Sequence, residues 1–85
     1  MKRKITYSFK KLDETVANKI CKALKHALFA FNISERDTRW IVTKLSRWEL
    51  MLGLNNEEHI ATAIEEMNDN ADRIIRLLKR AKIIN

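Results

Sequence analysis

The sequence predicts a mainly helical protein: a three-helix bundle preceded by a short N-terminal strand or arm. Proline is absent and Gly53 is the only glycine among 85 residues, whereas sheet-rich domains usually need several turns with positive φ. Apolar residues make up 46% of the chain and charged residues 33%, a composition that supports a hydrophobic core. Beyond the N-terminus, the apolar residues recur at helical spacing. We therefore expect residues 1–85 to form a single helical domain.

The first element is a basic strand or arm, predicted over residues 1–11. Residues 4–9 (KITYSF) alternate between polar and apolar side chains, which is the pattern of a strand with two different faces. A lone strand cannot satisfy its own backbone hydrogen-bonding groups. The segment would therefore pair with its copy in a homodimer, extend the sheet of a partner, or remain an arm.

The first helix is predicted over residues 13–31. Asp13 and Glu14 suit the positive N-terminal end of a helix dipole. Apolar residues three and four positions apart then form a stripe that would face the core; they are Val16, Ile20, Ala23, Ala27 and Ala30, with Leu24, Leu28 and Phe31 beside them. Cys21 is the only cysteine, which excludes a disulfide within the chain, and we expect its thiol to be buried as a small apolar side chain.

The second helix is predicted over residues 34–52. Ser34 followed by Asp37 is typical of a capped helix start. Gly53 would supply the left-handed residue that commonly ends a helix. The inner face would be formed by Ile41, Leu45, Trp48 and Leu52.

The third helix is predicted over residues 56–83, with Asn55 or Asn56 as its N-cap. Its apolar residues follow a heptad-like seam, the pattern of bundle packing: Ile60, Ile64, Met67, Ala71, Ile74, Leu78 and Ala81. On the outer face of this helix the charged residues are acidic in the N-terminal half and basic in the C-terminal half. Asp69 and Arg73, four residues apart, would form an ion pair. The poor helix formers at 68–70 (NDN) leave open a kink or break there.

Net charge points to a polyanionic partner. The chain carries +6, and residues 1–31 contain eight lysines and arginines against two carboxylates. A concentrated positive field attracts nucleic acid, although excess lysine also serves plain solubility. The candidate nucleic-acid-binding residues are Lys2, Arg3, Lys4, Thr6, Ser8, Lys10, Lys11, Lys19, Lys22 and Lys25.

A basic strand followed by two helices resembles the ribbon-helix-helix repressors over residues 1–52. The resemblance implies a dimer whose paired strands enter the major groove. It also implies that Lys4, Thr6 and Ser8 read base edges, and that amides near Ser34 contact phosphate. The chain departs from that pattern in a longer first helix and in the turn 32–33, where that family has a glycine.

A protein partner is the alternative. In this reading the chain is a helical adaptor, inhibitor or antagonist that uses its unpaired strand and helical surface. Trp40 would contact the partner, flanked by Arg36, Arg39 and Arg47, because tryptophan and arginine are enriched at binding hot spots.

Catalytic and metal-binding patterns are not found in the sequence. His26 and His59 have no ligand-type spacing around them, and the serines lack a nucleophile signature. We expect no enzyme activity, no cofactor, no metal and no small-molecule substrate. A membrane surface is a weaker candidate partner. Residues 1–11 have charge but no apolar core of a signal peptide, so we expect a cytoplasmic protein.

Overall fold

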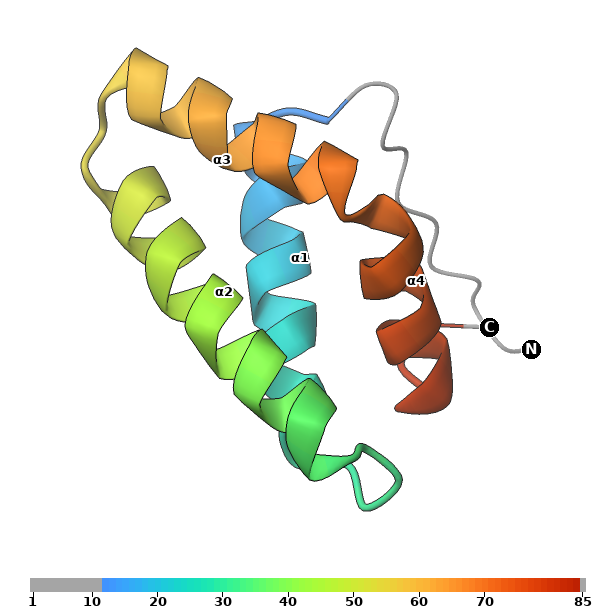
Figure 1. Ribbon diagram of the computed structural model, residues 1–85. Coiled ribbons are helices and arrows are strands. Elements are labelled where there is room, and N and C mark those ends of the chain that lie inside the picture. The colour runs from blue at the N-terminus through green and yellow to red at the C-terminus, as the bar shows by residue number, and fades with distance from the viewer. Residues whose placement is uncertain (1–11, 85) are drawn as a thin grey trace.

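The computed structural model describes residues 12–84, which form four α-helices and no strand (Figure 1). The helices are α1 (Glu14–Ala27), α2 (Glu35–Gly53), α3 (Glu57–Asp69) and α4 (Ala71–Arg80). Helix α1 contacts all three of the others, and α3 joins the end of α2 to the start of α4. The mainly helical class is confirmed, with four helices instead of the expected three. The expected strand or arm, and its pairing in a dimer, lie outside the described residues.

Helix α1 begins as predicted and ends earlier. The Asp13 side chain accepts a hydrogen bond of 2.9 Å from the Val16 amide, which makes Asp13 the N-cap. The helix ends at Ala27, four residues before the predicted end at Phe31. Beyond Ala27 the backbone tightens into i→i+3 bonds, such as Ala30 N–H to the Ala27 carbonyl at 3.1 Å. This tighter winding turns Phe31 out to solvent, so the apolar stripe ends with the helix.

Helix α2 begins at its predicted cap, since the Ser34 hydroxyl accepts from the Asp37 amide at 3.1 Å. The predicted role of Gly53 is wrong. Gly53 is the last residue of α2 and has a negative φ, and the left-handed residue is Asn55 at φ 54°. Asparagine tolerates this conformation better than most residues. Asn56 then caps α3 by accepting from the amides of Glu58 (2.9 Å) and His59 (3.3 Å).

The predicted third helix is divided at Asn70. This residue leaves the helical region, with φ −106° and ψ 15°. Its amide and its side-chain Nδ2 both donate to the Glu66 carbonyl, at 3.1 and 2.7 Å. Asparagine and aspartate favour such local bonds over a continuous helix. The break lets α4 turn away from α3 and run down beside α1 (Figure 1).

The core lies between the four helices. Its largest fully buried side chains are Trp48, Ile20, Leu24, Ile41, Met67, Ile74 and Leu78. The last three belong to the predicted seam, which therefore packs within the molecule. Cys21 is buried as expected, and burial raises the pKa of its thiol to about 11. Within residues 12–84, no helix combines the length and apolar character needed to cross a bilayer.

Candidate functional site

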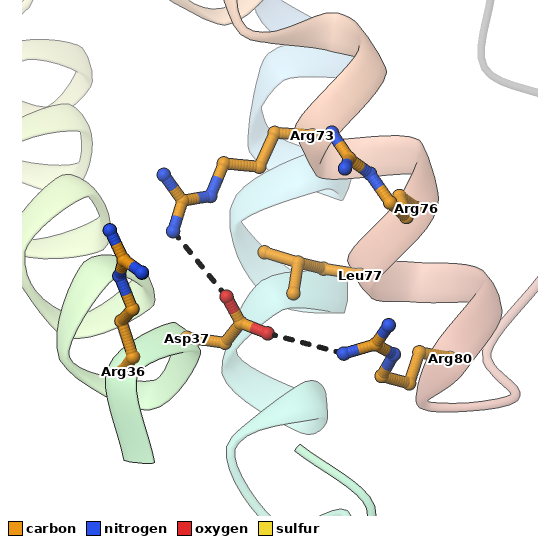
Figure 2. Close-up of a pocket in the computed structure, with 6 residues that line it drawn as sticks. All are labelled: Arg36, Asp37, Arg73, Arg76, Leu77 and Arg80. Carbon is orange, nitrogen blue, oxygen red and sulfur yellow. Dashed lines mark hydrogen bonds and ion pairs between the residues drawn. The ribbon is translucent and has the colours of Figure 1, made fainter. Parts of the chain in front are cut away.

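A concave feature lined mostly by arginines lies between the start of α2 and α4 (Figure 2). It is an open pocket of about 340 Å³, which we call the arginine pocket, lined by Arg36, Asp37, Arg73, Arg76, Leu77 and Arg80. Four arginines and one aspartate give its lining a formal charge of +3. The arginine pocket is thus a region of concentrated positive charge in the described part of the chain, separate from the basic residues that the sequence places in its first third.

The break at Asn70 creates this pocket. Arg73, Arg76 and Arg80 are three and four residues apart, so they share one face of α4. Leu77 lies on the same face and is buried, which fixes that face against the body of the protein. Helix α3 carries five carboxylates and no lysine or arginine, whereas α4 carries four basic residues and one aspartate. Turning α4 at Asn70 therefore separates the basic residues from the acidic ones and directs them toward α2.

Asp37 is the carboxylate inside the pocket. Its two oxygens pair with different arginines, Oδ1 with Arg73 at 3.4 Å and Oδ2 with Arg80 at 3.6 Å (Figure 2). Within residues 12–84, Arg36 and Arg76 have no carboxylate within 4 Å. The expected Asp69–Arg73 pair is wrong, because the break places Asp69 on α3 and the arginine on α4. Two cations of the pocket thus have no counter-ion among the described residues.

Trp40 supports one wall of the pocket. The guanidinium of Arg73 lies over its ring, with Cζ 4.4 Å from the ring centroid, a cation–π contact. The ring also meets Trp48 edge-on at 6.2 Å and an interplanar angle of 84°. Trp40 is half-buried and packed against the core. Trp40, the predicted partner-binding residue, is therefore partly exposed, and Arg73 lies over its ring.

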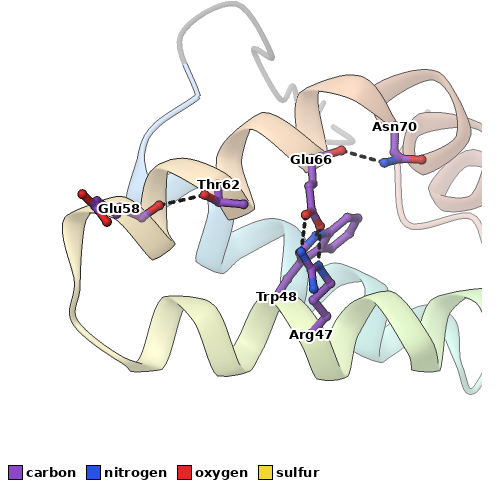
Figure 3. A network of polar contacts seen from close by, with 6 residues as sticks. All are labelled: Arg47, Trp48, Glu58, Thr62, Glu66 and Asn70. Carbon is purple, nitrogen blue, oxygen red and sulfur yellow. Dashed lines mark hydrogen bonds and ion pairs between the residues drawn. The ribbon is translucent and has the colours of Figure 1, made fainter.

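The carboxylate of Glu66 binds the indole of Trp48 (Figure 3). Its carboxylate accepts two hydrogen bonds from Arg47, at 2.7 and 2.6 Å, and one from the indole Nε1 of Trp48 at 3.0 Å. The hydrogen bonds from Arg47, aided by the indole, lower the pKa of Glu66 to about 2 against the opposing effect of burial. Arg47 thus links α2 to α3 through this ion pair.

The other candidates from the sequence are distributed as follows. Arg39 forms an exposed pair with Glu35 at 3.9 Å, and Lys25 pairs with Glu49 at 2.9 Å. Lys19 and Lys22 are exposed on α1. Of the predicted partner-binding arginines, only Arg36 lies in the pocket. The predicted residues Lys2, Arg3, Lys4, Thr6, Ser8, Lys10 and Lys11 lie outside the described residues.

The lysines of α1 and the arginine pocket do not form one site. Lys25 and Lys22 line a groove against Glu49 and Gly53, at the C-terminal end of α2. Arg36 lies in the first turn of the same helix, about 20 Å away along its axis. Sequence reasoning missed Arg73, Arg76 and Arg80 as site residues, although their spacing and the NDN break before them were the available signals.

The described residues show no group of three or more His, Cys, Asp or Glu side chains that could hold a metal ion. No protein-family model, curated protein or solved structure shows significant similarity to this chain.

Proposed function

We propose that this protein is a non-catalytic module that binds nucleic acid through its phosphates. One observation carries the proposal: four arginines from two helices converge on a pocket that holds a single carboxylate. Arginine is suited to this role because its planar guanidinium donates two parallel hydrogen bonds to a phosphate and stays charged. The basic residues 1–11 and the lysines of α1 would add further phosphate contacts.

The arginines of the pocket come from two facing helices, which suits a ligand with more than one phosphate. Arg73 and Arg80 are two turns apart on α4, about 10 Å along its axis. Arg36 approaches from the opposite wall, on α2 (Figure 2). Arg73 and Arg80 both reach the carboxylate of Asp37, so their guanidiniums suit one phosphate held between them. Arg36 and Arg76 would contact the adjoining phosphates of a backbone, as in the positively charged grooves that follow nucleic-acid strands.

The lining chemistry supports binding over catalysis. Asp37 is the one side chain of the lining able to act as a general base, and both of its oxygens are already paired with arginines. The remaining lining residues are arginines and Leu77. These groups can hold and neutralise a phosphate, and none of them is a nucleophile.

Fluorescence anisotropy with short labelled DNA and RNA, measured across a salt series, tests the proposal. The test variant is Arg36→Gln with Arg76→Gln, because within residues 12–84 these two arginines have no ion-pair partner to lose. Affinity of the parent protein should fall steeply as salt rises from about 50 to about 200 mM. The variant should bind more weakly and show a log–log salt slope reduced by roughly two, about one for each lost phosphate contact.

The matched control is Arg39→Gln with Lys79→Gln. It removes one exposed cation from each of the same two helices, outside the pocket lining. The control should retain most of the parental affinity. Equal losses in both double variants would show that net charge alone drives binding, and absence of binding to DNA and RNA at low salt would refute the proposal.

A further inference from the structure

Two phenylalanines are fully presented to solvent in the loop between α1 and α2. Phe29 is 81% exposed and Phe31 107% exposed, the highest values among the exposed large apolar side chains of the described residues. Exposed single apolar residues are common on protein surfaces. Two aromatic rings two residues apart are less easily explained, since burial of a phenylalanine is strongly stabilising.

The loop is anchored to the rest of the protein at both ends, so the exposure of the two phenylalanine rings follows from the fold. Leu28 and Ile33, on either side of the pair, pack against the core. The Ser34 cap fixes the far end of the loop to α2. Residues 28–33, which we call the arch, are therefore anchored at both ends by partly buried side chains and carry Phe29 and Phe31 exposed between them.

The arch is attached to the arginine pocket. The side-chain amide of Asn32, the residue after Phe31, donates a hydrogen bond to the backbone carbonyl of Arg80. The side chain of Arg80 lines the pocket. On its other side the loop leads directly into the first turn of α2, which carries Arg36. The loop that carries the two rings is thus tied by Asn32 to α4 and leads into α2, the two helices whose arginines line the pocket.

We propose that the arch and the arginine pocket form one binding surface for single-stranded nucleic acid, in which unpaired bases stack on Phe29 and Phe31 while the adjoining phosphates bind the arginines. This rests on the proposed function and deepens it by naming the form of nucleic acid. Stacking platforms beside a positively charged groove are how proteins hold single strands. In a duplex the bases are already stacked on each other, so the rings have no free base faces to contact.

Anisotropy titrations with a labelled single strand and a duplex of equal length test this inference. In the variant Phe29→Ala with Phe31→Ala, affinity for the single strand should fall by roughly 5- to 100-fold for each base that loses its stacking partner. Affinity for the duplex should change little, because the arginines remain. Replacing both residues by tyrosine keeps the rings and should keep single-strand affinity.

The matched control is Leu50→Ala, which removes an apolar side chain that is 64% exposed on α2 and lies outside the pocket lining. It should bind both probes like the parent. If the double alanine variant binds the single strand as tightly as the parent while Arg36→Gln with Arg76→Gln weakens binding, this inference is wrong and the proposed function stands. A parent that binds the duplex more tightly than the single strand also overturns the inference. If neither probe binds, both proposals fail together.

Discussion

The guanidinium carbon of Arg73 lies 4.4 Å from the centroid of the Trp40 ring. The same guanidinium reaches Asp37 at 3.4 Å, and the Trp40 ring meets Trp48 in the core. A charged residue of the pocket is thereby coupled to the packing of the bundle. This arrangement positions Arg73 without burying its charge.

We expect Trp40 and Arg73 to be energetically coupled. In a double-mutant cycle with Trp40→Leu and Arg73→Met, the coupling free energy of unfolding should be about 0.5–1 kcal/mol, the range of an exposed cation–π contact. Urea unfolding followed by circular dichroism measures it. The control cycle replaces Arg73→Met by Arg76→Met, since among the described arginines it is Arg73 that lies over the Trp40 ring. A coupling no larger than that of the control would show that the stacked geometry contributes nothing.

Asp37 should oppose ligand binding even though it orders the pocket. Its carboxylate occupies Arg73 and Arg80 in the free protein, and a bound phosphate would have to share them. In Asp37→Asn, affinity for nucleic acid at low salt should rise by roughly three- to tenfold, because one negative charge leaves the site. The free energy of unfolding should fall by about 1 kcal/mol or less, since partly exposed ion pairs stabilise weakly.

The control for this effect is Glu65→Gln, which removes an equal charge from the exposed face of α3. It should change affinity much less than Asp37→Asn. Weaker binding by Asp37→Asn would mean that the carboxylate is needed to orient the two arginines, and that its charge is secondary.

Glu66 should make the protein sensitive to acid. Its pKa is lowered from 4.5 to about 2 in the folded state, so its stabilising contribution is complete above about pH 4.5 and is lost as pH falls toward 2. In Glu66→Gln this contribution is absent at every pH. The stability difference between the parent and the variant should therefore be largest near pH 7 and should narrow below pH 4.5.

Urea midpoints at several pH values, read from tryptophan fluorescence, would show this narrowing. Glu65→Gln is again the control, as the neighbouring carboxylate has no recorded ion pair or hydrogen bond in the described residues. A difference between the parent and Glu66→Gln that stays constant from pH 7 to pH 3 would contradict the lowered pKa of Glu66.

Local patterns in the sequence were sufficient to predict where the helices begin and which residues form much of the core. Ser34 and Asn56 cap helices as predicted, and Asp13, predicted to begin the first helix, is its N-cap; a capping side chain bonds to amides two or three residues away. Trp48 and Cys21 are buried as expected. These features depend on neighbours along the chain, and sequence spacing records them directly.

The arginine pocket depends on contacts that spacing does not record. The NDN segment allowed a break, but the direction in which α4 turns is set by the packing of residues such as Ile74 and Leu78 in the core. Likewise, no local pattern reveals that Asp37 meets Arg80 across 43 positions or that Arg47 is held by Glu66. The basic N-terminal residues stood out in composition, whereas the arginines of α4 were balanced by the acidic residues before them.

The C-terminal end of α4 carries a residue in a strained conformation. Lys82 has φ 61°, a left-handed conformation that costs a non-glycine residue about 1 kcal/mol. Lys82 occupies the position after a helix where glycine is common. The Ile83 N–H donates to the Leu78 carbonyl at 2.9 Å, and the Lys82 N–H donates to the Lys79 carbonyl at 3.0 Å. These are the paired hydrogen bonds of a Schellman motif. Lys82→Gly should therefore raise the free energy of unfolding by up to about 1 kcal/mol, visible as a higher urea midpoint. Lys82→Ala separates this effect from loss of charge, since alanine removes the ammonium and keeps the strain. If the alanine variant is stabilised as much as the glycine variant, charge repulsion at the end of α4 is the cause, and the backbone conformation of Lys82 is not.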